Sequence, residues 1–389
     1  MPSWRATDDS DTDSFPSTLT VVMNHRLAAL SLGFSLTACG GAIAADGTVP
    51  GELQPNPATP AGPWSPNAAC TPVGPVVKRL ADLGDGSPGA LVPNGPDLWF
   101  TALTRDGSSG APSVGLYRVA TAGGAPVLEP SAGRIGVAFA VSEANLAIVR
   151  ITEVSPSSAF ESLVVRDRKT GAELAVTVPS KQRLGSLHAT PSGLFYATQD
   201  PSSVAASIAY FDGTRSKPVS SLRSPLMFVT DAREVFYIRY GTSTGNRVLE
   251  SASLQDGSSP RIVKDFGAPV NDGHRVIGVD DTEVFVARTS PIGHGTFNDG
   301  DVLAIRKDGG GERVVVTIPG FVGDAIVDPD YVTWTDGILG KAIGRARLSG
   351  GPVERIEVAG NVRPLAADAC NLYWATSEPN AIYARSRLP

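Results

Sequence analysis

The chain has 389 residues, of which 42% are hydrophobic and only 19% are charged, so it can bury a sizeable core. Its 42 glycines and 31 prolines favour many turns and short strands over helices. The formal net charge of -6 argues against general nucleic-acid binding, because that function needs a cationic face to displace counterions.

The first predicted element is a secretory signal at residues 23–41, MNHRLAALSLGFSLTACGG. A short polar start precedes an apolar run over 27–36, and small residues and Cys39 follow. The run is too short to span a bilayer as a mature helix, which favours a signal peptide over a permanent anchor. Residues 1–22 are polar and acidic, unlike the start of a signal. We therefore expect them to be a non-native extension, with translation beginning at Met23.

The tetrapeptide LTAC at 36–39 resembles the lipobox of bacterial lipoproteins. In that family the signal peptide, here 23–38, is removed and the cysteine is acylated. The resemblance therefore implies a lipid on Cys39 that anchors the protein to a membrane of the cell envelope. Family members with aspartate after the cysteine tend to stay at the inner membrane. Gly40 at this position implies outer-membrane sorting. The alternative is a chance apolar stretch before a free cysteine.

Residues 39–70 predict a flexible tether, because they are rich in Pro, Gly, Ala and Asn and have no strand or helix period. Such a tether suits a lipid-anchored domain that is held away from the membrane surface. We expect residues 71–389 to form that domain.

The expected domain contains seven copies of one strand signature, which ends in large apolar or aromatic residues and usually follows an Asp, Asn or Gly turn. Successive copies are 49, 47, 41, 49, 48 and 40 residues apart. A short strand leads into each copy, and two further strands separated by a Gly-rich turn follow it. The copies end at Phe100, Val149, Tyr196, Tyr237, Val286, Trp334 and Trp374.

Four short strands in 40–49 residues match one blade of a β-propeller, whose sheet buries both faces against neighbouring blades. No stretch has a sustained 3.6-residue apolar period, which disfavours an α/β fold. Two stacked sandwiches would not explain a sevenfold repeat. We predict an all-β propeller of seven four-stranded blades, with six or eight blades as alternatives. The signatures should form the second strand of each blade and pack between blades.

The units resemble YWTD and TolB-like propeller repeats, most clearly in VTWTDG at 332–337. The similarity covers only the strand signature across residues 90–376, and the other copies are degenerate. YWTD propellers usually have six blades, whereas seven signatures occur here. The resemblance implies the fold. It does not imply the receptor function of family members.

The final unit ends after three strands, so its fourth strand must come from elsewhere in the chain. Residues 74–84, GPVVKRLADLG, are similar to 351–360, GPVERIEVAG, which complete the preceding unit. We expect a strand at about 76–83 to pair with the C-terminal strands and close the ring, since an open ring would leave bare sheet edges.

Two cysteines remain if Cys39 is lipidated. Cys70 lies just before the closing strand, and Cys370 lies in the turn before the last signature. In an exported protein these two positions predict a disulfide that locks the ring, and two free thiols are the alternative.

Little catalytic chemistry is visible, since the chain has no nucleophile elbow, zinc-binding HExxH helix or phosphate-binding glycine loop. We expect His188 on an innermost strand, His274 where the chain enters a blade, and His294 in the longest inter-strand loop. The sequence NDGD at 298–301 lacks a calcium-loop pattern and is interpreted as a hairpin turn. His274 and His294 could form a metal or acid/base site with Asp272, Asp299 or Asp301. No fixed ligand spacing supports that site, so we expect neither metal nor cofactor.

These observations predict a non-catalytic, monomeric binding module anchored in the envelope, with an envelope protein or glycan as its partner. One alternative is an envelope hydrolase or lyase, in which His188 and His274 converge with a carboxylate or metal at the centre of the ring. Another is a scaffold with a large exposed apolar patch. The expected binding loops are 104–113, 152–161, 240–247 and 288–301. The expected ligand contacts are Arg239, Tyr240, His274, His294 and Phe297.

Overall fold

The structure is a computed structural model that describes most of the chain from Cys70 to Arg387. The predicted signal peptide, lipobox and tether all precede residue 70. They lie outside the described residues. All described residues belong to one compact unit of the chain, 34–389. The described ranges are 70–105, 112–130, 134–155, 158–176, 178, 183–190, 193–199, 205–223, 228–231, 233–240, 246–253, 260–267, 273–291, 297–319, 322–336 and 340–387.

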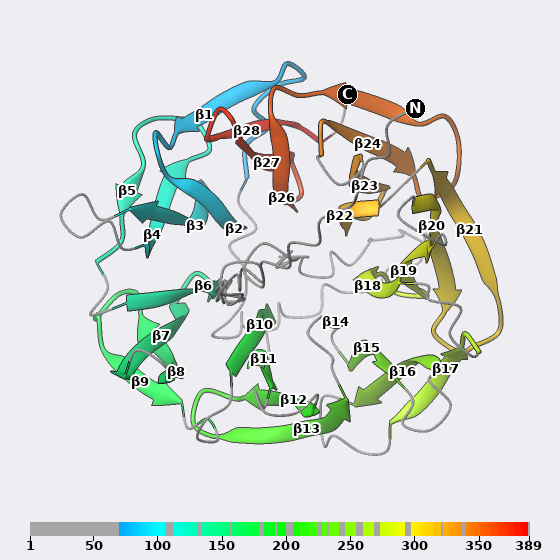
Figure 1. Ribbon diagram of the computed structural model, residues 1–389, viewed down its shortest axis with the longest axis horizontal. Helices are drawn as coiled ribbons and strands as arrows, with labels where there is room; N and C mark the ends of the chain where they lie inside the picture. Colours follow the sequence, from blue (N-terminus) through cyan, green and yellow to red (C-terminus); the bar gives the residue numbers. More distant parts are fainter. Residues whose placement is uncertain are drawn as a thin grey trace, which may run out of the picture. The chain divides into compact units, whose positions relative to one another are not determined.

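Seven four-stranded antiparallel sheets form the described part of the chain, and they are arranged as the blades of a β-propeller (Figure 1). The predicted fold class and blade number are confirmed. No helix occurs among the described residues, and hence none that could cross a membrane.

Blades 1 to 4 each use four consecutive strands. Blade 1 contains β2 (Ser87–Asn94), β3 (Asp97–Arg105), β4 (Pro112–Ala120) and β5 (Val127–Leu128). Blade 2 contains β6 (Arg134–Val141), β7 (Asn145–Ser155), β8 (Ser158–Asp167) and β9 (Glu173–Val176). Blade 3 contains β10 (Arg183–Thr190), β11 (Gly193–Gln199), β12 (Ala205–Phe211) and β13 (Ser216–Arg223). Blade 4 contains β14 (Phe228–Thr230), β15 (Glu234–Tyr240), β16 (Arg247–Ser253) and β17 (Arg261–Asp265).

Blades 5 and 6 follow the same plan, and blade 7 combines both ends of the folded chain. Blade 5 contains β18 (Gly273–Val279), β19 (Glu283–Pro291), β20 (Phe297–Arg306) and β21 (Glu312–Ile318). Blade 6 contains β22 (Val322–Val327), β23 (Tyr331–Asp336), β24 (Ala342–Arg347) and β25 (Glu354–Glu357). Blade 7 contains β26 (Asn361–Ala367), β27 (Asn371–Ser377), β28 (Ala381–Ser386) and β1 (Lys78–Asp82).

Closure of the ring depends on β1, which pairs antiparallel with β28 from Lys78↔Ala384 to Asp82↔Ala381. The closing strand predicted at about 76–83 is therefore confirmed. It forms the outer edge of blade 7, beside the C-terminal strands (Figure 1). The Asn371 side chain adds to this closure, because its Oδ1 accepts the Val73 N–H at 2.9 Å. Both ends of the folded chain thus complete one sheet.

The signature residues form the core between blades, as predicted. Each lies on the second strand of its blade, and each is between 0% and 3% exposed. Phe285 of blade 5 and Trp334 of blade 6 belong to one buried cluster. Phe195 of blade 3 and Tyr237 of blade 4 belong to another. Burial of these large side chains on both faces of the sheets holds neighbouring blades together.

Aspartates before the signatures close the turns between the first and second strands. Asp280 Oδ1 accepts the backbone N–H groups two and three residues further on, both at 2.7 Å. Asp231, Asp328 and Asp368 make the same pair of bonds. This Asx-turn chemistry confirms that these carboxylates are turn residues.

All four predicted loops are shorter than expected, because their flanking strands continue into them as hairpins. Pairing reaches Arg105↔Pro112 within 104–113 and Tyr240↔Arg247 within 240–247. Within 152–161, pairing extends to Ser155↔Ser158. Within 288–301, β19 reaches Pro291 and β20 starts at Phe297. The NDGD segment is therefore part of β20, and its interpretation as a turn is wrong.

The NDGD segment is held in the strand by side chains across the sheet. Asp301 forms an ion pair with Arg288 of β19 and accepts the Thr317 hydroxyl at 2.9 Å. These interactions fix Asp301 in an extended register that its residue type does not itself favour.

Candidate functional site

The strand order gives the ring two different faces. In each blade the first strand runs from the connection with the preceding blade to the turn before the second strand. The turns between first and second strands and between third and fourth strands therefore share one face, which we call the turn face. The hairpin ends between second and third strands and the connections between blades share the other, which we call the loop face. The predicted binding loops all belong to the loop face.

Arg239 lies near the loop-face end of β15, but an ion pair occupies its guanidinium. Its Nε and Nη2 lie 2.7 and 2.6 Å from Oε1 of Glu250 on β16. Glu250 is only 5% exposed, and its hydrogen bond raises the pKa of Arg239. The ion pair within blade 4 uses two of the five N–H donors of Arg239. Its role as a ligand contact stays a prediction.

His274 lies near the loop-face end of β18 and packs between blades 4 and 5. Its ring lies 4.3 Å from the Phe266 ring, centroid to centroid. Its Nδ1 lies 3.5 Å from Nη1 of Arg247. The residue is only 9% exposed. The His274 side chain is therefore packed in the interface between blades 4 and 5.

The other predicted contacts fall partly or wholly outside the described structure. The backbones of Tyr240 and Phe297 lie at the loop-face ends of β15 and β20. Their side chains are not described, and neither is any part of His294. Their roles as ligand contacts stay predictions.

His188 and His274 do not converge. His188 lies on β10 two residues before the turn, and its Nδ1 is 3.2 Å from the Thr230 hydroxyl of blade 4. It is therefore close to the turn face, whereas His274 is close to the loop face. Asp301, the described carboxylate of the conceived metal site, is paired with Arg288. The arrangement expected for a hydrolase or lyase built on these two histidines is thus absent from the described strands.

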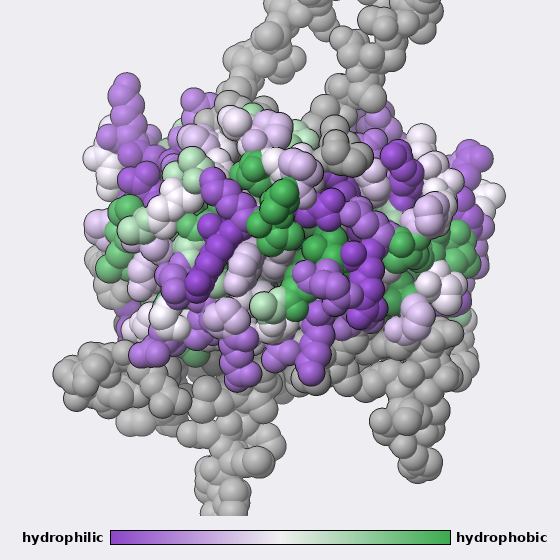
Figure 2. Space-filling view, turned by 90° about the horizontal axis from the view of Figure 1, so that it is seen from above, coloured by the Kyte–Doolittle hydropathy of each residue, from purple (hydrophilic) through white to green (hydrophobic). Residues whose placement is uncertain are grey.

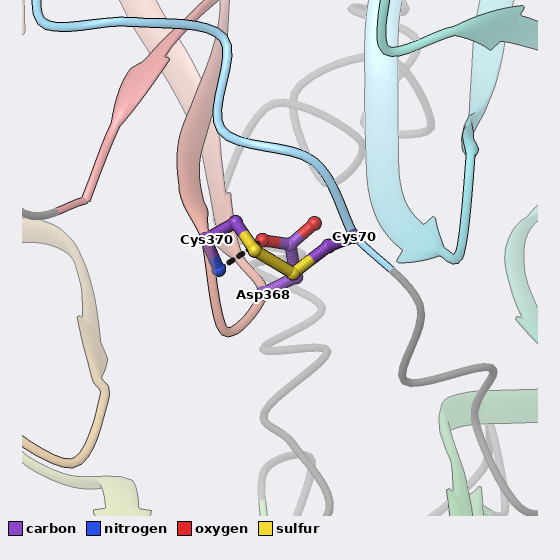
Figure 3. A group of neighbouring side chains, drawn as sticks. All are labelled: Cys70, Asp368 and Cys370. Atoms are coloured by element: carbon purple, nitrogen blue, oxygen red, sulfur yellow. Dashed lines mark hydrogen bonds between the residues drawn. A yellow bond between two sulfur atoms is a disulfide. The ribbon is translucent and has the colours of Figure 1, made fainter.

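Figure 3 shows the group formed by Cys70, Asp368 and Cys370. Their ligand-type atoms lie within 4.8 Å of one another, the one such group of three or more among the described residues. The two sulfurs are bonded to each other as a disulfide, and the cysteines are 300 positions apart in the sequence.

The Asp368 carboxylate is also occupied. It caps the turn through the Cys370 N–H, and its Oδ2 accepts the Tyr373 hydroxyl at 2.8 Å. Burial, followed by the Asp368 charge, raises the pKa of Tyr373, which therefore stays a hydrogen-bond donor. The disulfide closes the ring covalently. Because the sulfurs and the carboxylate of this group all have partners, none of these atoms is free to bind a metal.

Exposed hydrophobic side chains are spread around the outer side of the ring. Figure 2 shows such side chains on one part of it, in small groups between hydrophilic ones. They occur in or next to the outer strands of six blades, a distribution that differs from the single large patch expected of a scaffold. Among the described residues they are Val76, Val77, Val127, Leu128, Leu174, Ile262, Val314 and Val353.

A charged group that was not predicted from the sequence lies on the innermost strands. It consists of Arg275 of β18, Asp324 of β22 and Arg363 of β26, and we call it the inner charged group. These strands belong to blades 5, 6 and 7, and each contacts the next. Asp324 is 7% exposed, and both arginines are half-buried. The group lies in the half of the inner strands nearer the loop face.

The Arg275 guanidinium interacts electrostatically with both other members of the group. Burial lowers the pKa of Arg275, while the Asp324 carboxylate opposes this shift and the Arg363 charge adds to it. The Nη2 atom of Arg275 is buried and has no hydrogen-bond partner in the described structure. A buried donor without an acceptor is unusual in folded proteins and marks Arg275 for closer attention.

No protein-family model and no curated protein matches this chain. Similar folds occur among solved structures. An oligogalacturonate lyase in complex with manganese matches with a TM-score of 0.54 and 10% identity, over 82% of this chain and 98% of that one. An acylaminoacyl peptidase from Pyrococcus horikoshii matches with a TM-score of 0.54 and 11% identity, over 78% of this chain and 52% of that one.

The β-propeller domain of the Trilobed protease from Pyrococcus furiosus matches with a TM-score of 0.53 and 10% identity, over 77% of this chain and 95% of that one. That domain is described as having an open velcro topology, whereas β1 and β28 close the ring here. At these identities the similarity shows a shared β-propeller fold alone.

Proposed function

We propose that this chain is an exported, lipid-anchored protein of the bacterial cell envelope whose propeller binds a partner through its loop face. The Cys70–Cys370 disulfide is the observation that carries the proposal. Disulfides persist in oxidising compartments and are rare in the cytosol. This bond begins at the end of the predicted tether, so the lipobox resemblance and the closure of the ring support the same cellular route.

Binding is favoured over catalysis by the way in which the loop face is built. The β7–β8 and β19–β20 hairpins continue towards it as paired strands. Paired strands present recognition side chains with less conformational freedom than open loops, which lowers the entropic cost of binding. The described histidines and Arg239 are engaged in packing or ion pairs, as expected of a rigid scaffold.

The anchor is tested by changing Cys39→Ala and separating membrane from soluble fractions of the producing cells. Unchanged protein should incorporate labelled fatty acid and sediment with membranes, whereas the variant should do neither. A Cys70→Ala variant controls for general effects of cysteine loss. Equal membrane association of the unchanged and Cys39→Ala proteins would contradict the lipid anchor.

Partner binding is tested by crosslinked pull-down of the full-length protein from detergent-solubilised envelope, read by mass spectrometry. The variant replaces residues 290–299 with Asn-Gly, joining Thr289 to its cross-strand partner Gly300. A second variant of the same design replaces residues 153–159 with Asn-Gly, joining Thr152 to Phe160. A stoichiometric partner that only one truncation removes would support the proposal and locate the contact. Recovery of the unchanged protein alone would contradict it for protein partners.

A further inference from the structure

We propose that the inner charged group is an anion-binding site, in which Arg275 and Arg363 hold a carboxylate or phosphate group of a small ligand. The inference rests on the proposed binding function and adds the chemical class of one ligand.

The placement of the two arginines follows from the repeat. Arg275 and Arg363 each lie five residues before the turn aspartate of their blade, Asp280 and Asp368 respectively. They therefore have the same place in the sequence repeat, on blades 5 and 7 on either side of blade 6. In the strand register, Arg275 pairs with Ala287, whereas Arg363 lies in the bulge between Val362 and Leu365. The residue at this place in the repeat of blade 6 is Gly323, which has no side chain.

The balance of charge in the group favours an added anion. Two arginines and one aspartate give a net charge of +1. Burial disfavours the charged form of Arg275 most, the Asp324 carboxylate favours it, and the Arg363 charge disfavours it. Half-buried like charges repel more strongly than exposed ones, because less water screens them. An anion between the arginines would relieve that repulsion.

The hydrogen bonding of Arg275 also favours an additional hydrogen-bond acceptor. Its buried Nη2 has no hydrogen-bond partner in the described structure. Arg150 and Arg385 also have one unsatisfied buried nitrogen, but each has a carboxylate elsewhere on the same guanidinium, Glu173 and Glu354 respectively. The planar guanidinium fork matches a carboxylate or phosphate, which can accept two of its N–H groups.

The test is calorimetric titration of the full chain in detergent with inorganic phosphate and, separately, with citrate, at constant ionic strength. Saturable binding of at least one probe is expected, and the stronger one identifies the group recognised. Arg275→Gln and Arg363→Gln should each weaken binding by about tenfold or more. Asp324→Asn should strengthen it, because it removes the one negative charge of the group. Arg355→Gln, an exposed position paired with Asp336 and Glu357, is the matched control and should leave binding unchanged.

A thermal melt of each variant shows whether it is folded. Opposite effects of the arginine and aspartate substitutions in folded protein cannot arise from a merely structural role. No saturable binding by the folded unchanged protein up to about 10 mM probe would overturn the inference. So would equal binding by the unchanged protein and the arginine variants. If the envelope pull-down still yields a partner lost on hairpin truncation, the proposed binding function stands and only the anion site fails.

Discussion

At the scale of single residues, the turn aspartates show how a polar side chain shapes the backbone. Asp280 Oδ1 accepts two backbone N–H groups that the turn would otherwise leave without a partner. Its neighbour Asp281 is exposed. Two adjacent carboxylates thus have different structural roles, although the sequence presents them as a pair.

Replacement of Asp280 by Ala should lower the free energy of unfolding by about 1–2 kcal/mol, because two hydrogen bonds to the turn backbone are lost. The matched change Asp281→Ala should leave it within about 0.5 kcal/mol of its original value. Urea denaturation of both variants checks this. Equal destabilisation by the two substitutions would show that the turn bonds contribute nothing specific.

Acid should destabilise the fold through turn carboxylates whose pKa is lowered. Hydrogen bonds from Thr214 lower the pKa of Asp212, and those from Thr170 lower the pKa of Asp167. Both carboxylates therefore bind protons more readily in the unfolded chain than in the folded chain. The stability that Asp212 and Asp167 contribute is present above the unfolded pKa of 3.8 and is lost as pH falls below it.

The melting temperature should therefore fall between about pH 5 and about pH 2. Asp212→Asn should make this decline shallower. An unchanged pH dependence in that variant would mean that Asp212 does not contribute to it.

The inner charged group marks the limit of residue-level prediction. Arg275 and Arg363 are separated by 88 residues, and no motif connects them. Alignment of the blades on their turn aspartates would have put both arginines at one position. The burial of Arg275 Nη2 depends on neighbouring blades and could not be predicted from the chain alone.

At the scale of strands, the sequence predicted the apolar signatures better than the polar hairpin ends. The second strands carry large apolar residues on both faces, which is a strong signal for a strand buried between sheets. Polar hairpin ends such as the start of β20 have no apolar alternation. Their pairing depends on partners such as Arg288 and Asp301, whose contact becomes visible only in the folded sheet.

Close packing across strands gives a sharp prediction at Gly344 of β24, the cross-strand partner of Trp334. A Cβ at Gly344 would lie 2.2 Å from the indole ring, so Gly344→Ala forces Trp334 out of its buried position. Stability should fall by about 1–3 kcal/mol. Gly311→Ala is the control, since a Cβ there meets nothing within 4 Å. Urea denaturation compares the two variants, and equal midpoints would contradict the packing described for Trp334.

At the scale of the whole molecule, the period of 40–49 residues was enough to predict the fold and the exchange of strands between the termini. A ring needs a closing strand, and the N-terminal segment resembles the strand that is missing from the last unit. The chemistry at the loop face could not be predicted in the same way, because recognition residues follow no repeat.

The closed ring of an exported protein is the central claim, and non-reducing peptide mapping of protein isolated from the producing cell tests it most directly. We expect a peptide linking Cys70 to Cys370, recovered from the membrane fraction together with an N-terminal peptide acylated at Cys39. Free thiols at Cys70 and Cys370 in protein recovered from the soluble cytosol would contradict both the covalent closure and the proposed cellular location.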